Sequence, residues 1–300
     1  MKSALIIVNY KTPKMTADLV SSVMDFPVFD KIIIVDNRSL DNSYEKLKYL
    51  DGGKVDVLKN SKKGGFGSAV NEGVQYVKDN FYPDFIFLAS SDVLFSEECA
   101  NEMADCLRQR SDAAMVTANM KTPFKKGYTP VAWRLPTTFS EIVSSGLITY
   151  KLFRNTRLVH FYSENYVNSQ RPYCEVDCAM TAFCCIRTSM FMKAGMFDTD
   201  FTFYCEESVL GWKFKEKEYA VLLLTDYHYD RSYGTSLEFN KKSLAKEKRQ
   251  LFKSNYLYLK KYRNVNKLKL FFVKLFMKLW VVEFWCYSKL DKLRWWKRKG

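Results

Sequence analysis

A chain of 300 residues with 47% hydrophobic side chains can bury a full core, and it suits one large domain or one domain with an appendage. The formal charge of +14 lies in one place: residues 241–300 hold 19 Lys and Arg against 3 Asp and Glu, whereas residues 1–240 balance near −2. This distribution argues against a nucleic-acid-binding body and marks the basic tail as a separate functional unit.

The first 120 residues alternate strand and helix patterns. Buried strands are expected at 4–8, 32–35, 55–58, 85–89 and 113–118. Helices are expected after Thr12-Pro13 to about Met24, from Ser39 or Asp41 through Leu50, after the glycines at 64–67 to about Lys78, and after Ser96. Continuous apolar strands with amphipathic helices between them indicate an α/β fold with a doubly wound, mostly parallel sheet.

The ends of the predicted strands carry polar side chains. Asp36, Asn60 and Asp92 all follow such strands, and ligands bind at the carboxyl ends of the strands in a doubly wound sheet. The apolar run 4–8 ends at Asn9 without a small-residue cleavage site, so we expect no signal peptide.

Further along, the periodicity breaks between about 120 and 175, apart from a short helix at about 139–153. Strand and helix patterns return over 176–240, and residues 241–300 are helical, basic and aromatic. We therefore predict one domain over 1–240, with halves at about 1–120 and 121–240, followed by the tail. The eight cysteines include no Cys-x-x-Cys pair, so reduced cysteines are expected rather than a zinc or disulfide framework.

The segment Phe203-Tyr-Cys-Glu-Glu-Ser-Val-Leu-Gly-Trp-Lys213 places two adjacent carboxylates, Glu206 and Glu207, behind an aromatic pair. Phe197-Asp198 stands just upstream, and the apolar run 178–187 precedes it. An acidic pair alone is common on solvated helices, but this order resembles the acceptor-side half of the family 2 glycosyltransferases, which have the GT-A fold. The resemblance implies that the second carboxylate, Glu207, is the catalytic base. Most members carry Asp there, and the longer side chain leaves Glu206 as the alternative.

The first half also resembles the donor side of that family. Val8-Asn9-Tyr10 ends the first strand and Val35-Asp36-Asn37 ends the second. The resemblance implies that Asp36 accepts a hydrogen bond from the ring N–H of a pyrimidine nucleotide. A glycine-rich stretch, similar to that of rhamnosyltransferase-like members, implies phosphate binding by backbone N–H groups at a helix N-terminus. Its matching residues are Asn60, Gly64, Gly65, Phe66 and Asn71.

Ser91-Asp92 stands where the family has its metal-binding Asp-x-Asp element. The resemblance implies a divalent cation, Mg²⁺ or Mn²⁺, although only one carboxylate is present and such sites are rich in carboxylates. His228 begins a stretch similar to the family's histidine followed by Gly-x-Ser, and such a histidine is often a second ligand of the metal or the diphosphate. Arg231 is expected to contact the diphosphate by its charge.

The resemblance implies an inverting transferase that moves a sugar from a nucleotide-diphosphate donor to a glycan hydroxyl. The donor is expected to be deoxythymidine-diphosphate rhamnose, or a uridine-linked hexose or galactofuranose. A sugar-phosphate nucleotidyltransferase stays open, although residues 8–12 lack its usual Gly-rich, Arg/Lys-containing signature. A nucleic-acid-binding protein also stays open, but it would leave the Glu207 and His228 motifs without a use.

The tail is expected to dock on an anionic membrane surface. On a helix, lysines form one stripe and apolar residues fill most of the remaining circumference. The stripe consists of Lys267, Lys274, Lys278, Lys289 and Lys292. Charges interrupt every stretch of about 18 residues, so an interfacial helix fits better than a spanning one, with Trp280, Trp285, Trp295 and Trp296 at headgroup level.

We therefore expect a peripheral protein at the cytoplasmic face of the membrane that acts on a lipid-linked acceptor in polysaccharide assembly, such as O-antigen or capsule. The alternative is a helical hairpin that packs on the core or pairs two copies as a homodimer.

Overall fold

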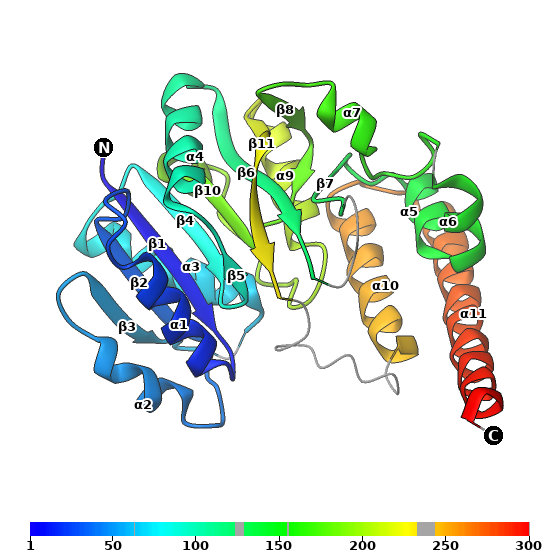
Figure 1. Cartoon of the computed structure of the whole chain (residues 1–300). Coiled ribbons are helices and arrows are strands. Elements are labelled where there is room, and N and C mark those ends of the chain that lie inside the picture. Colours follow the sequence, from blue (N-terminus) through cyan, green and yellow to red (C-terminus); the bar gives the residue numbers. More distant parts are fainter. Residues whose placement is uncertain (63, 124–128, 155, 233–243, 300) are drawn as a thin grey trace.

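The computed structural model describes residues 1–62, 64–123, 129–154, 156–232 and 244–299, without the side chains of 244, 245 and 288–299. A nine-stranded sheet crosses the molecule in the order β3-β2-β1-β4-β10-β6-β11-β5, and β8 pairs with β11 (Figure 1). Its strands are β1 (Ser3–Asn9), β2 (Lys31–Asp36), β3 (Val55–Lys59), β4 (Phe85–Ser90), β5 (Val93–Leu94), β6 (Ala113–Lys121), β8 (Tyr173–Val176), β10 (Phe183–Arg187) and β11 (Ala220–Arg231). A second, two-stranded sheet pairs β7 (Ala132–Trp133) with β9 (Cys178–Ala179).

Strands β1 to β4 are parallel to one another, with Val8 opposite Val35 and Ser90. The side chains of β1 and most of β2 are buried because helices cover both faces of this part of the sheet. Strand β10 enters antiparallel between β4 and β6, so the sheet is mixed. The predicted α/β class with a mostly parallel sheet is confirmed.

Three of the four helices expected in the first half are confirmed with small shifts: α1 (Pro13–Val23), α3 (Phe66–Asn80) and α4 (Glu97–Gln109). Ser96 caps α4 by accepting a hydrogen bond from the Cys99 N–H at 3.1 Å. The helix expected from Ser39 or Asp41 is shorter: α2 spans Ser43–Leu47, and a 3₁₀ turn, η1, spans Lys48–Leu50. Ser39 lies before the N-cap position, Asn42, and its hydroxyl instead donates to Asp36 and accepts from the Lys11 N–H at 2.9 Å.

The second half contains α5 (Thr138–Ser145), α6 (Leu147–Phe153), α7 (Glu164–Asn168), α8 (Thr188–Lys193) and α9 (Glu206–Lys215). The helix expected at 139–153 breaks at Gly146, where a Cβ atom would lie 3.0 Å from the ring of Trp280. The apolar run 178–187 is likewise two strands, β9 and β10, rather than one. Between them Met180 donates its N–H to the Val131 carbonyl at 2.8 Å.

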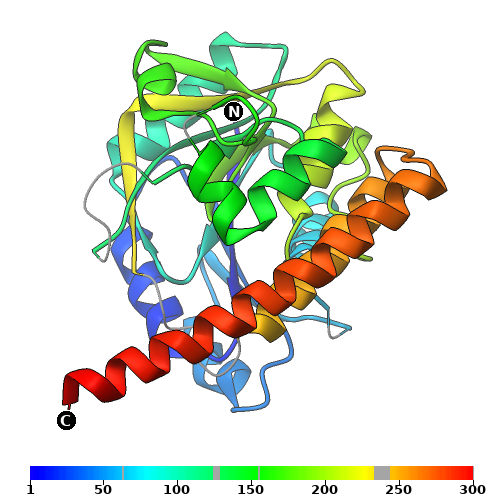
Figure 2. The same cartoon turned by 90° about the vertical axis from the view of Figure 1, so that its right-hand side faces the viewer.

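The basic tail forms two helices, α10 (Leu244–Lys261) and α11 (Lys267–Lys299), which pack side by side. Together with the acceptor half they form a second hydrophobic core, which includes Tyr258 and Val273 of the tail and Phe201 and Val209 of the acceptor half. The expected boundary at 240 lies outside the described residues. The tail packs on the second half, and α11 runs along the outside of the molecule (Figure 2).

All eight cysteines are free. In the part of the chain that the structure describes, no helix combines the length and apolarity needed to cross a bilayer.

Candidate active site

Asp36 stands at the end of β2 and is completely buried. Its carboxylate accepts three hydrogen bonds: from Asn9 Nδ2 at 2.7 Å, from Ser39 Oγ at 2.6 Å and from the Ser39 N–H at 3.0 Å. A carboxylate offers about four acceptor positions, so one is left for a donor such as a pyrimidine ring N–H, which could reach this side chain only if the residues that cover it moved apart. The carboxylate is therefore oriented in advance as an acceptor.

Asn9 orients Asp36 from the end of β1. Its Oδ1 accepts from Thr16 Oγ1 at 2.9 Å and from Thr12 Oγ1 at 3.4 Å, so the amide is engaged at both atoms. The Thr12 hydroxyl also lies 2.9 Å from the Ser91 hydroxyl. Of the other residues expected at this strand end, Val8 is in the core and Tyr10 is exposed.

The glycine-rich stretch is tied to the end of β2. Asn60 Nδ2 donates to Asn37 Oδ1 at 2.8 Å, and Asn37 Nδ2 donates to the Gly64 carbonyl at 2.9 Å. A Cβ atom on Gly65 would lie 2.5 Å from the Thr202 carbonyl oxygen. Glycine is required there because the backbone of the second half packs directly on this loop. Phosphate binding by the same loop stays a prediction.

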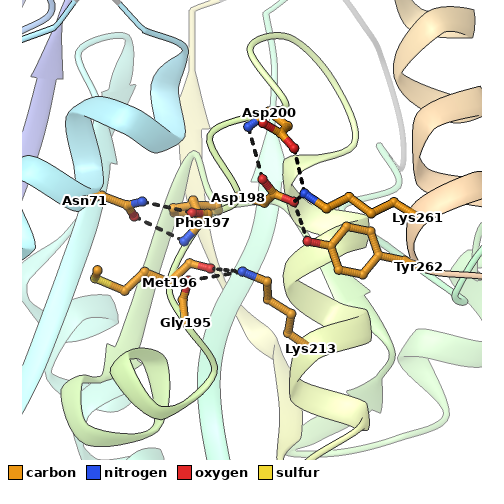
Figure 3. A network of polar contacts seen from close by, with 9 residues as sticks. All are labelled: Asn71, Gly195, Met196, Phe197, Asp198, Asp200, Lys213, Lys261 and Tyr262. Atoms are coloured by element: carbon orange, nitrogen blue, oxygen red, sulfur yellow. Dashed lines mark hydrogen bonds and ion pairs between the residues drawn. The ribbon is translucent and has the colours of Figure 1, made fainter.

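Asn71 and Phe66 connect α3 to the second half. Asn71 Nδ2 donates to the Phe197 carbonyl at 2.9 Å, and the Phe197 N–H donates to Asn71 Oδ1 at 3.1 Å (Figure 3). The Phe66 ring packs edge-on against the Phe197 ring at 6.1 Å. Both Asn71 atoms are thereby engaged, which favours a positioning role over the expected direct contact with a donor.

Asp92 is buried near the end of β4 and forms an ion pair with Arg231, at 3.1 Å between Nε and Oδ2. The two residues are 139 positions apart, and the pairing of β5 with β11 brings them together. The Ser232 N–H donates to the Asp92 carbonyl at 3.0 Å. Burial raises the pKa of Glu207, and the positive charge of Arg231 opposes this rise.

His228 is exposed, and its Nε2 lies 2.8 Å from the Lys121 ammonium. Successive side chains of a strand point to opposite faces, so His228 and Arg231, three residues apart on β11, face opposite sides. No group of three or more His, Cys, Asp or Glu side chains suited to a metal occurs among the described residues. The expected pairing of His228 with Asp92 stays a prediction, and the residues Gly234 and Ser236 of its motif lie outside the described residues.

Glu206 and Glu207 begin helix α9. The two residues before them, Tyr204 and Cys205, both have φ of 69°, a left-handed conformation that costs energy for residues with a side chain. The helix begins directly after these two left-handed residues, so the two carboxylates lie in its first turn. Strain of this kind clusters at functional sites.

The two carboxylates differ in their surroundings. Burial, together with the neighbouring charge of Glu207, raises the pKa of Glu206 to about 8. Burial also raises the pKa of Glu207, but a hydrogen bond from Thr181 Oγ1, at 3.2 Å, and the charge of Arg231 oppose this shift. Burial therefore opposes a charge on both carboxylates, and the contacts of Glu207 with Thr181 and Arg231 favour its ionised form. The sequence analysis did not identify Thr181 as a site residue. Its position as a polar residue within the apolar run 178–186 could have indicated such a role.

Helix α10 holds the segment 198–205 that leads to these carboxylates. Lys261 Nζ lies 2.6 Å from Asp198 Oδ2 and 2.7 Å from Asp200 Oδ2, and the Tyr262 hydroxyl also donates to Asp198 (Figure 3). Burial alone would raise the pKa of Asp198, but the hydrogen bonds from Lys261 and Tyr262 keep this pKa below its ordinary value. The Asp198 carboxylate is thus ionised and bound to Lys261 and Tyr262 of the tail.

Two more contacts hold the same segment. Ser254 Oγ on α10 donates to the Phe203 carbonyl at 2.6 Å, and Cys205 Sγ donates to Asn255 Oδ1 at 2.8 Å. From α9, Lys213 Nζ donates to the Met196 carbonyl at 2.7 Å. No sequence pattern indicated Ser254 and Asn255 as partners, because they lie about 50 residues from Phe203 and Cys205.

Comparison with known proteins supports one family. The model of glycosyl transferase family 2 matches residues 4–181. No curated protein matches the chain. A solved structure described as GalNAc-T7 with UDP, GalNAc and Mn²⁺ superimposes with a TM-score of 0.60 at 13% sequence identity. The superposition covers 86% of this chain and 50% of that one, so this chain spans about half of its length. At this identity the likeness shows the fold. The family model covers more than half of the chain, and the protein belongs to glycosyl transferase family 2.

Proposed function

We propose that this nucleotide-sugar-dependent glycosyltransferase takes a sugar from a pyrimidine nucleoside diphosphate and transfers it, with inversion, to a hydroxyl group of a lipid-linked glycan. The observation that carries the proposal is the ion pair between Asp92 and Arg231, at 3.1 Å, beside the end of β4. The family binds the diphosphate of the donor at this position.

In the proposed reaction, Glu207 accepts the proton of the acceptor hydroxyl as its oxygen attacks the anomeric carbon. The bond from that carbon to the diphosphate oxygen breaks, and the nucleoside diphosphate leaves with the electron pair. A single displacement inverts the anomeric configuration. A general base works best when its pKa lies close to the working pH, and burial moves the pKa of Glu207 in that direction.

Arg231 is proposed to stabilise the departing diphosphate, because a guanidinium binds phosphate oxygens through two parallel N–H donors. Its partner, Asp92, would hold the divalent cation, because Mg²⁺ is commonly held by one or two carboxylates together with substrate phosphates. His228 is the second expected ligand, and its ring lies beside the Lys121 ammonium. A bound Mg²⁺ or Mn²⁺ would neutralise charge on the diphosphate.

The nucleotide is proposed to be recognised by Asp36, which stands at the end of β2 and whose carboxylate already accepts three hydrogen bonds. Uridine and deoxythymidine share the ring N–H that such an acceptor reads. The similar solved structure holds UDP and Mn²⁺, which supports testing uridine donors first, followed by deoxythymidine-diphosphate rhamnose.

The experiment is a panel of sugar nucleotides with and without Mn²⁺, read first by thermal shift and then by release of nucleoside diphosphate. A ligand at about 100 times its dissociation constant stabilises a protein by roughly 2.7 kcal/mol, which such a screen detects. Release of nucleoside diphosphate supports a glycosyltransferase, release of pyrophosphate from a nucleoside triphosphate would indicate a nucleotidyltransferase, and full activity in EDTA would remove the cation from the proposal.

A further inference from the structure

Helix α11 carries two apolar faces, and only one of them is used inside the protein. The inner face packs on α10 and α5, and the Trp280 Nε1–H donates to the Ile142 carbonyl at 3.2 Å. This inner face consists of Leu270, Val273, Met277, Trp280, Val281 and Phe284. At 100° per residue these six side chains occupy an arc of about 100°.

The outer face is a second apolar stripe on the opposite side of the same helix. It consists of Leu268, Phe271, Phe272, Leu275, Leu279 and Val282, all of which are exposed. These also fall within an arc of about 100°, centred half a turn from the inner face. In Figure 2 α11 crosses the front of the molecule and no other element covers it. Even the least exposed of the six, Leu275, is 44% exposed, and contiguous apolar surface of this kind marks an interaction site.

Lysines border the outer face. Lys267, Lys274 and Lys278 are exposed and fall between the two faces on one side, and Lys269 is exposed on the other. The one acidic residue between 262 and 290 is Glu283. Its two carboxylate oxygens accept the N–H groups of Leu147 and Ile148 at 2.8 and 3.0 Å, so this charge is used to cap α6. The outer face is therefore apolar in the middle and positive at its edges.

We propose that the outer face of α11 lies in the headgroup region of an anionic lipid bilayer. Its apolar side chains enter the acyl boundary, and the long lysine stems let the ammonium groups reach lipid phosphates. A second copy of the chain is the weaker choice of partner, because two such faces would bring lysines together with no described carboxylate on either face to pair with them. Anionic lipid supplies both the apolar phase and the opposite charge.

Helix α6 extends the same surface. Ile148, whose N–H is bonded to Glu283 of α11, is 63% exposed, and Leu152 one turn further is 69% exposed. Because α6 belongs to the acceptor half, this orientation would bring that half to the bilayer. The proposal is independent of the sugar transfer and would also explain how the enzyme reaches a lipid-linked acceptor.

Flotation of the full-length protein with vesicles tests the proposal. The vesicles contain equal parts of phosphatidylglycerol and phosphatidylcholine, with pure phosphatidylcholine as the neutral arm. Phe271→Ser with Leu275→Ser is expected to lower binding to anionic vesicles at least tenfold. Tyr49→Ser with Tyr82→Ser is the matched control, because it removes two exposed aromatic side chains far from α11 and should leave binding unchanged.

A series of Lys→Gln variants measures the electrostatic contribution to vesicle binding. Lys267→Gln, Lys274→Gln and Lys278→Gln together should weaken binding to anionic vesicles by about fivefold per lysine, corresponding to about 1 kcal/mol each. Lys46→Gln, Lys193→Gln and Lys217→Gln remove the same charge from other surfaces and should have little effect.

Thermal unfolding and donor binding, measured on every variant, confirm that it is folded. If the wild type ignores anionic vesicles at low salt, or if both α11 variants bind as well as their controls, the proposal is wrong. A wild-type dimer in light scattering that the Phe271→Ser, Leu275→Ser variant dissociates, without vesicle binding, would show that the face joins two copies instead.

Discussion

The carboxylates on the two sides of the site are held in different ways. On the donor side, Asp36 accepts three hydrogen bonds, and the side chains that donate them, Asn9 and Ser39, lie within 30 residues along the chain. On the acceptor side, burial raises the pKa of Glu207, and the hydrogen bond that Thr181 Oγ1 donates at 3.2 Å opposes this rise. A binding group benefits from a fixed acceptor, whereas a base must take up a proton, for which a raised pKa is favourable.

The largest effect is expected at Glu207. Glu207→Gln should lower kcat by roughly 10²–10⁴-fold, the usual contribution of a general base, and leave donor affinity nearly intact. Steady-state kinetics with a saturating acceptor and donor titration measure both. Glu206→Gln is the matched variant. A collapse of kcat in Glu206→Gln, with near-normal turnover in Glu207→Gln, would reassign the base.

Substitution of Asp36 should affect binding instead. Asp36→Ala removes a charged acceptor, and hydrogen bonds of this kind contribute about 1.5–3 kcal/mol. We therefore expect donor affinity to fall by roughly 10–100-fold for every pyrimidine donor, with a smaller change in kcat at saturation. Calorimetric titration with a uridine and a deoxythymidine donor is the measurement. Unequal losses for two pyrimidine donors that carry the same sugar would show that the carboxylate does not read the shared ring N–H.

Loss of the contact between α10 and the segment 198–205 should affect the acceptor side of the site and leave the donor side unchanged. Lys261→Met removes the ion pairs to Asp198 and Asp200, which leaves the segment before Glu206 less firmly held. Because small displacements of catalytic groups are costly, we expect kcat to fall about tenfold and the acid limb of its pH profile to move, with donor affinity unchanged. Lys260→Met, an exposed neighbour, is the control. An unshifted pH profile would assign Lys261 to stability alone.

The smallest effect concerns stability and pH. The pKa of Glu206 is raised to about 8 in the folded protein, so this group favours the folded state while it is protonated in both states. As pH rises above its ordinary pKa of 4.5 and through the folded value, that contribution is lost, at most by about 1.4 kcal/mol per pH unit.

Glu206→Gln should therefore reduce the fall in stability between pH 5 and pH 8, the range set by that shift. Urea unfolding at several pH values is the measurement, and Glu216→Gln, on the exposed end of the same helix, is the control. An identical slope in wild type and Glu206→Gln would show that Glu206 does not hold the proton.

The tail helices show a similar contrast between what local pattern and tertiary contact decide. The sequence predicted that α11 is amphipathic, since lysines and apolar residues repeat at helical spacing. It did not indicate that α10 and the inner face of α11 share a core with Phe201 and Val209. Truncation at Asn240 would expose that core, so substitutions on the outer face of α11 are the cleaner test of membrane binding.

Local periodicity determined most of the fold. Continuous apolar runs predicted β1, β2, β4 and β6, because a strand buried on both faces requires apolar side chains at every position. The polar residues that follow these runs predicted the edge of the sheet where Asp36 and Asp92 stand, since parallel strands end together.

Partners across the chain were decided by the tertiary structure alone. Three contacts show this: Arg231 with Asp92, Asn71 with Phe197 and Lys261 with Asp198. Their partners are separated by 139, 126 and 63 positions along the chain. Which side chains meet depends on the strand order and on the antiparallel entry of β10, neither of which leaves a periodic signal in the sequence. The same holds for the raised pKa values of Glu206 and Glu207, because burial is a property of the packed molecule.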